Sequence, residues 1–221
     1  MFLAFACLLV NALAQAPNAP KAPNSMLAPI EDAPGLPRVL LIGDSISMGY
    51  TGPVRELLKG KANVHRIPQN GGPTRLGVAK IDSWLGKGKW DVIHFNWGIH
   101  DLKFMPDGKR QVEPGDYEKN LRELVAKMKA TGAKLIWATI TPIPSGELIP
   151  PRRFGEVAEY NAIAQRVMTE NGVGIDDLNA AVTPHLAKLQ NPQDVHFNAD
   201  GSKFLGAEVA KHIEAGLPKA K

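Results

Sequence analysis

The stretch VLLIGDSISMGY, residues 39–50, joins an apolar run to a small polar turn. The run is rich in branched aliphatic side chains and does not alternate with polar residues, which is typical of a strand buried on both faces. The turn that follows, Gly43-Asp44-Ser45, presents a serine hydroxyl directly after the strand. Ser45 is therefore either a nucleophile at the end of a strand or the N-cap of the next helix.

Similar short apolar runs recur along the chain and alternate with amphipathic stretches. The predicted strands are residues 38–43, 62–67, 91–96, 133–140 and, more weakly, 173–176. The predicted helices are residues 53–59, 75–86, 115–131, 154–171 and 199–215. Strands that alternate with helices form βαβ units, so we predict an α/β fold: a three-layer α/β/α sandwich around a parallel sheet of about five strands.

The first residues are expected to lie outside this domain. Residues 1–16 have an apolar run too short to span a bilayer and end in small residues of the A-x-A type, which predicts a signal peptide. No Lys or Arg precedes the run, so an uncleaved anchor is the alternative. Cys7, the single cysteine, would be lost on cleavage. Residues 17–36, rich in Pro and Ala, are predicted to be a linker.

The overall composition favours a soluble globular domain, and the predicted signal peptide directs it out of the cytoplasm. Of the 221 residues 22% are charged, and the net charge of +4 is scattered without a dense basic run. We therefore expect no nucleic-acid partner, no stable membrane insertion after signal cleavage, and a monomer in the periplasm or outside the cell. No histidine pair shows metal-ligand spacing with a third ligand, so neither a metal nor another cofactor is expected.

Polar residues follow the predicted strands, where ligands bind in parallel sheets. A serine needs a base within hydrogen-bond reach, and His196 in QDVHFNADG is the best candidate. Asp194, two residues earlier, is positioned to orient the imidazole. The alternative is an ordinary loop histidine before a helix. Candidate oxyanion donors are the backbone N–H groups of Ser45 and Gly72 and a side chain from NWGIHD, residues 96–101.

These four blocks, GDSIS, the glycine of NGGPT, GIHD and DVHFN, resemble the SGNH hydrolases, also called the GDSL lipase/esterase family. The resemblance covers residues 38 to about 215, so we assign residues 37–217 to an SGNH hydrolase domain. It implies a flavodoxin-like sheet and ester hydrolysis through an acyl-enzyme. Ser45 takes the place of the nucleophile and His196 that of the base, while Gly72 and Ser45 take the places of two oxyanion donors.

The chain departs from the family pattern at two points. The third block usually reads Gly-x-Asn-Asp, but His100 stands at the Asn position, so either His100 or Asn96 is expected to complete the oxyanion hole. The acid is commonly three residues before the histidine, where this chain has Gln193, whereas Asp194 is two residues before. Some SGNH-like acyltransferases are similar in this spacing.

The substrate is the least determined feature. Trp97 is expected at the mouth of the site, either stacking on a substrate or covering the core. Arg152 and Arg153 border the expected pocket and are candidates to bind an acidic group, or else are solvated. No long apolar lid is evident, so we predict a serine esterase that removes a small acyl group, acetyl, from a small-molecule or carbohydrate ester. The alternatives are an O-acyltransferase and a non-catalytic carbohydrate-binding descendant of the fold.

Overall fold

The computed structural model describes residues 26–218. Its centre is one sheet of five parallel strands in the order β2-β1-β3-β4-β5. The strands are β1 (Arg38–Ile42), β2 (Asn63–Arg66), β3 (Val92–Phe95), β4 (Lys134–Ala138) and β5 (Gly174–Asp176). The predicted α/β fold and parallel sheet are confirmed. The predicted signal peptide, residues 1–16, lies outside the described residues, as does the linker up to residue 25.

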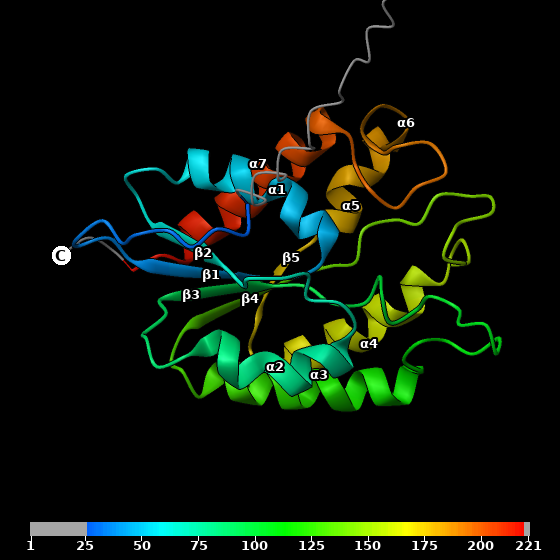
Figure 1. Cartoon of the computed structure of the whole chain (residues 1–221), viewed down its shortest axis with the longest axis horizontal. Helices are drawn as coiled ribbons and strands as arrows, with labels where there is room; N and C mark the ends of the chain where they lie inside the picture. Colours follow the sequence, from blue (N-terminus) through cyan, green and yellow to red (C-terminus); the bar gives the residue numbers. More distant parts are fainter. Residues whose placement is uncertain (1–25, 219–221) are drawn as a thin grey trace, which may run out of the picture.

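Helices cover both faces of the sheet (Figure 1). One face carries α2 (Thr74–Leu85), α3 (Pro114–Lys129) and α4 (Val157–Glu170). The other face carries α1 (Ser45–Leu57), α5 (Leu178–Val182) and α7 (Ala199–Gly216). The short η1 (Thr183–His185) and α6 (Leu186–Leu189) connect α5 to the loop before α7. In the part of the chain that the structure describes, no helix has the length and apolar content needed to cross a membrane.

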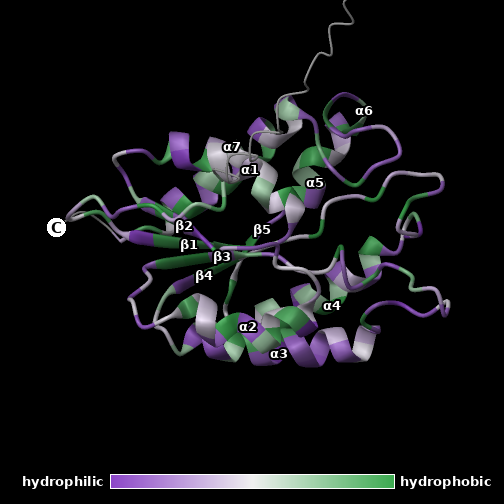
Figure 2. Cartoon of the chain, in the orientation of Figure 1, coloured by the Kyte–Doolittle hydropathy of each residue, from purple (hydrophilic) through white to green (hydrophobic). Residues whose placement is uncertain are grey.

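The alternating side chains of β1 fill two separate hydrophobic cores. Leu40 and Ile42 pack in the core beneath α2, α3 and α4, whereas Val39 and Leu41 pack in the core beneath α1 and α7. Hydrophobic residues, coloured green, are common along the strands, and hydrophilic residues, coloured purple, are common on the outward sides of the helices (Figure 2). Because β1 is buried on both faces, its apolar run has no polar alternation.

Helix α1 begins eight residues before the predicted start at residue 53. The Asp44 side chain accepts a hydrogen bond from the backbone N–H of Ile46 at 2.9 Å and thereby caps the helix. Asp44, not Ser45, is thus the N-cap, and Pro53 lies inside the helix. The helix packs closely on α7, where a Cβ added to Gly206 would lie 2.6 Å from the Pro53 Cβ atom.

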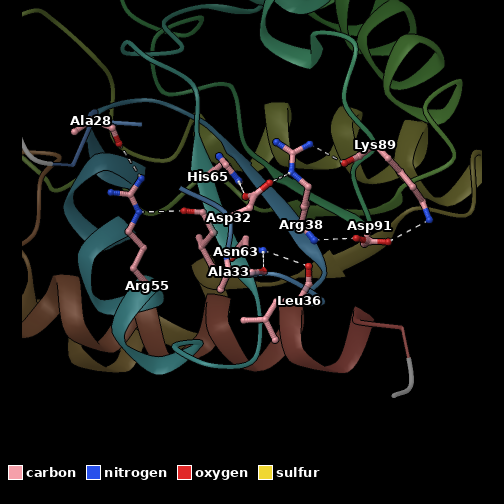
Figure 3. A network of polar contacts seen from close by, with 11 residues as sticks. Ala28, Asp32, Ala33, Leu36, Arg38, Arg55, Asn63, His65, Lys89 and Asp91 are labelled. Carbon is pink, nitrogen blue, oxygen red and sulfur yellow. Dashed lines mark hydrogen bonds and ion pairs between the residues drawn. The ribbon is translucent and has the colours of Figure 1, made fainter. Parts of the chain in front are cut away.

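The end of the predicted linker is attached to the domain (Figure 3). Residues 26–36 contain no helix or strand, but they lie along β2 and are held by its polar side chains. Asn63 accepts a hydrogen bond from the backbone of Ala33 at 2.8 Å and donates to the carbonyls of Ala33 and Leu36. Asp32 pairs with His65 at 2.6 Å. This segment therefore behaves as part of the domain.

Candidate active site

A continuous chain of hydrogen bonds joins Ser45, His196 and Asp194. The Ser45 Oγ atom lies 2.7 Å from His196 Nε2, and the other ring nitrogen, Nδ1, lies 2.7 Å from Asp194 Oδ1. Ser45 is the first residue of α1, and the other two residues belong to the loop that precedes α7. A serine, a base within hydrogen-bond reach and a carboxylate that orients the base are the parts that nucleophilic acyl transfer requires.

The loop that carries His196 is closed on itself. Gln190 and Phe197 form an antiparallel bridge, and the backbone N–H of Asn191 donates to the His196 carbonyl at 3.0 Å. After the loop, Asn198 caps α7 by accepting from the Gly201 N–H at 2.9 Å. These local bonds fix the backbone of His196, so the direction of its ring depends on its own side-chain partners.

The Asp194 carboxylate is suited to hold that ring. Its Oδ1 atom also accepts a hydrogen bond from the His196 backbone N–H at 3.1 Å. Partial burial raises the pKa of Asp194, but the backbone and ring hydrogen bonds from His196, together with its charge, outweigh burial and lower the pKa below the ordinary value. Asp194 is therefore an anion at neutral pH, as a partner of an imidazolium ion must be.

A buried arginine, which the sequence analysis did not single out, supports the turn beneath Ser45. Arg66 lies at the end of β2, where its Nη2 atom donates to the carbonyls of Gly43 at 2.8 Å and Asp44 at 3.0 Å. Burial lowers its pKa to about 10, which leaves it charged at neutral pH. A charged residue at the end of an apolar strand was the available signal in the sequence.

Two of the predicted oxyanion donors lie beside the serine. Ser45 and His100 line the same cavity, and the Ser45 backbone N–H has no acceptor within its own helix because it opens α1. Burial lowers the pKa of His100, so its imidazole is neutral at neutral pH and carries one N–H donor. An asparagine at this position would direct one side-chain N–H at the oxyanion, and the neutral ring of His100 can supply the same single donor.

The other two predicted donors are engaged elsewhere. The Gly72 backbone N–H donates to Asn70 Oδ1 at 2.8 Å, and φ of +56° places Gly72 in the left-handed region that favours glycine. The Asn96 amide donates to the Ala138 carbonyl at 2.7 Å, and its side chain lines a separate small cavity. In this arrangement His100 is better placed than Asn96 to be the third donor.

A buried carboxylate connects the loop of Gly72 to the loop of His100. Asp101 accepts from both the backbone N–H and the hydroxyl of Thr74, the first residue of α2. Burial raises the pKa of Asp101 to about 7, although the bonds from Thr74 oppose the rise. Nearby, Gly98 has φ of +140°, and a Cβ there would lie 2.1 Å from Ile140 Cδ1. The two loops are thus joined by two hydrogen bonds, and the loop of His100 also packs closely on Ile140, which follows β4.

The residues predicted to bind substrate fall into different places. The expectation that Trp97 lies at the mouth of the site is wrong: it is 1% exposed, packs on Phe95, and donates from Nε1 to the Gly71 carbonyl. Arg152 lines the cavity beside Ser45. Arg153 is exposed, stacks on Phe104 and does not line that cavity.

The cavity has a volume of about 160 Å³ and an uneven lining. Leu148, Ile149 and Pro150 contribute apolar lining to the cavity, and Lys103 and Arg152 contribute cationic side chains. Within residues 26–218, no group of three or more His, Cys, Asp or Glu side chains is arranged to hold a metal ion.

Comparison with known proteins identifies the family of the chain. The GDSL-like Lipase/Acylhydrolase family matches residues 41–204. No curated protein sequence matches. Several solved structures are similar in fold at low sequence identity. The lipase/acylhydrolase from Enterococcus faecalis has a TM-score of 0.72 at 21% identity, covering 84% of this chain and 100% of that one.

Two acetyl xylan esterases are among the similar structures. AlAXEase has a TM-score of 0.70 at 17% identity, with 80% of this chain and 99% of that chain covered. Axe2 from Geobacillus stearothermophilus has a TM-score of 0.64 at 23% identity, with 84% and 96% covered. At these identities the structures show the shared fold, while the match over residues 41–204 shows the family. The chain belongs to the GDSL-like lipase/acylhydrolase family of SGNH hydrolases and is an ester hydrolase.

Proposed function

We propose that the protein is a secreted acetylesterase that acts on a carbohydrate through a Ser-His-Asp acyl-enzyme mechanism. The observation that carries the proposal is the hydrogen-bonded chain from Ser45 Oγ through His196 to Asp194, next to a cavity of about 160 Å³. Ser45 attacks the ester carbonyl while His196 Nε2 takes the serine proton. His196 then gives that proton to the oxygen of the leaving alcohol.

Hydrolysis of the acyl-enzyme follows the same route in reverse. His196 removes a proton from water, and the resulting nucleophile attacks the acetyl carbonyl on Ser45. The bond between the acyl carbon and Ser45 Oγ then breaks, acetate leaves, and His196 returns the proton to Ser45 Oγ. Asp194 stabilises the imidazolium ion in both steps. The Ser45 N–H and the His100 ring N–H donate to the oxyanion, and removal of one such donor commonly lowers kcat by about 10²–10³-fold.

The small cavity favours a short acyl group. Its volume is below the range of about 300–1,000 Å³ typical of sites that enclose drug-sized ligands. A long acyl chain would not fit within this cavity. The names of two structures with the same fold, both acetyl xylan esterases, support acetyl as the acyl group and a sugar as the alcohol. The apolar run of residues 1–16 supports secretion.

The first test is labelling with a fluorophosphonate, followed by peptide mass spectrometry. We expect one adduct, on Ser45, and turnover of p-nitrophenyl acetate that far exceeds turnover of p-nitrophenyl octanoate. Ser45→Ala should abolish both labelling and turnover, whereas Ser83→Ala, at an exposed serine of α2, should change neither. A folded protein without an adduct would favour a carbohydrate-binding role for the same fold.

Transfer of the acetyl group to a sugar hydroxyl is the second candidate reaction. Its support is the two-residue spacing of Asp194 and His196, in which this chain resembles some SGNH-like acyltransferases. The two side chains are in contact at 2.7 Å. Adding an acceptor oligosaccharide to the p-nitrophenyl acetate reaction separates the two: an esterase releases acetate in proportion to p-nitrophenol. An acyltransferase would release less acetate and form an acetylated acceptor.

A further inference from the structure

Arg152 is a buried cation without an acidic partner. Arg152 is only 9% exposed. Its Nε atom donates to the Ile99 carbonyl at 2.7 Å, and its Nη1 atom donates to the Pro150 carbonyl at 3.3 Å. No described residue forms an ion pair with it. Burial lowers its pKa, opposed by the more distant charges of Asp44 and Asp194. A buried charge is costly unless it is paired, so its presence at the cavity calls for a counter-charge.

A second unpaired cation faces the same cavity. Lys103 is half-buried and makes no ion pair with any residue of the described chain. Burial lowers the pKa of its ammonium group, and the positive charges of Arg152 and Arg75 lower it further. Two like charges that line the same small cavity repel one another, which is destabilising in the free protein. They become favourable when an anion binds between or beside them.

The two carboxylates whose charges act on Arg152, Asp44 and Asp194, are already used. Asp194 Oδ1 is bonded to the ring and backbone of His196, and Asp44 Oδ1 caps α1 through the Ile46 N–H. Glu147 lies on the rim of the adjoining hollow, but it is exposed and is not within ion-pair distance of Arg152. The missing negative charge is therefore most simply supplied by the ligand.

Arg152 also borders more space than the reacting ester itself needs. It lines both the cavity beside Ser45 and a larger adjoining hollow of about 740 Å³, which shares Leu148, Ile149 and Gln193 with that cavity. The smaller space is next to Ser45 and suits the reacting ester. The larger one lies further along the loop of residues 146–152 and suits the rest of the substrate.

From these observations we propose that the natural substrate is an acidic ester, with a carboxylate on its alcohol part that binds Arg152 and Lys103. The inference rests on the proposed function, because an acetyl group has no room for a charge and the alcohol must carry it. A planar guanidinium matches the two oxygens of a carboxylate better than a single ammonium does, so Arg152 is the main contact. An acetylated sugar acid has this chemistry.

The test compares two substrates that differ by one charge: the per-O-acetylated methyl glycoside of glucuronic acid, and the methyl ester of its carboxyl group. The measured quantity is kcat/KM for acetate release, and the ratio of the acidic to the neutral substrate reports recognition of the charge. We expect a wild-type ratio of about 10 or more, since hydrogen bonds to charged groups commonly change affinity by that factor.

Arg152→Gln should lower this ratio about tenfold, Arg152→Lys should lower it less, and Lys103→Gln should lower it by a smaller factor. Arg153→Gln is the matched control, because this neighbouring arginine is exposed and lies outside the cavity, so the ratio should stay at the wild-type value. Thermal unfolding checks that each variant is folded. If Arg152→Gln does not fold, the ratio of acidic to neutral substrate measured for the soluble Lys103→Gln variant decides whether the proposal holds.

The outcomes separate this inference from the proposed function. A wild-type ratio near one, with acetate release that still requires Ser45, would overturn the acidic substrate and leave the esterase intact. A high ratio that Arg152→Gln and Lys103→Gln both preserve would also overturn it, because other groups would then read the charge. Absence of acetate release from both substrates and from p-nitrophenyl acetate, with no Ser45 adduct, would instead refute the proposed esterase.

Discussion

Asp194 Oδ1 accepts two hydrogen bonds from one residue, His196, from the ring at 2.7 Å and from the backbone at 3.1 Å. The pair therefore forms a closed local unit in which the carboxylate fixes both the ring and the peptide that carries it. Such a unit needs only a two-residue spacing. It explains how Asp194 can orient the imidazole although the acid stands one position closer than the family pattern leads one to expect.

We predict that Asp194→Asn lowers kcat for p-nitrophenyl acetate by about 10³–10⁴-fold, because an amide facing Nδ1 stabilises the wrong tautomer of the ring. The change in KM should be small. Asp200→Asn, in the exposed first turn of α7, serves as the control and should retain wild-type kinetics. Steady-state kinetics of an Asp194 variant within threefold of wild type would place the acid elsewhere.

His100 is predicted to act as an oxyanion donor through a neutral ring. His100→Ala should lower kcat about 10²–10³-fold, whereas His100→Asn, which restores an N–H donor, should recover most of that loss. The comparison uses kcat, because a donor that acts only in the transition state leaves KM nearly unchanged. Equal activity of His100→Ala and the wild type would show that the oxyanion is held by backbone groups alone.

Arg66→Met is predicted to affect both stability and rate. The substitution leaves the carbonyls of Gly43 and Asp44 without their buried donor, which should lower the free energy of unfolding by about 3 kcal/mol. The same turn positions Ser45, so kcat should fall in the fraction that remains folded. Urea unfolding and kinetics measure the two effects.

Arg75→Met is the control, because that side chain is exposed at the start of α2. A variant of Arg66 with wild-type stability would mean that water replaces the guanidinium beneath the turn.

The raised pKa of Asp101 predicts that the stability of the protein depends on pH. Burial raises its pKa from 3.8 to about 7, so between these values the folded protein binds a proton that the unfolded chain has released. The Asp101 contribution to the free energy of unfolding should therefore fall as the pH rises from about 4 to about 7. Asp101→Asn removes this titration, and its stability relative to the wild type should increase over that range.

Chemical unfolding at several pH values measures this difference. Ser83→Ala, at an exposed and non-titrating site on α2, is the control and should shift the curve by a constant amount. A constant offset for Asp101→Asn as well would contradict the raised pKa.

The strands could be read from the sequence because their apolar content is local information. Each of the five lies within its predicted range, and the order of the sheet follows from βαβ crossover rules once the family resemblance is recognised. Helix α1 was predicted too short because SISMGYTG has little helical periodicity, while the cap at Asp44 and packing on α7 extend it. The segments α5, η1 and α6 are only three to five residues long, too short to show any period.

The site was accessible to sequence reasoning where residues are consecutive or follow a motif, as Ser45 and His196 do. The environment of single side chains was not. Trp97 follows a strand as a surface residue would, yet the next residues turn and bury it against the core. Arg66 and Arg152 are both arginines in the printed sequence, and only the folded chain distinguishes one bound to backbone carbonyls under Ser45 from one at a cavity wall.

The attachment of residues 26–36 to β2 bears on how the protein should be produced. β2 is an edge strand of the sheet, and an uncovered edge is a template on which a second molecule can pair and aggregate. The contacts of Asn63 and His65 keep a chain segment over this edge. An expression start at residue 37, which the composition alone would recommend, removes that cover. A start at residue 26 or earlier keeps the edge protected and is expected to give the more soluble, monodisperse protein.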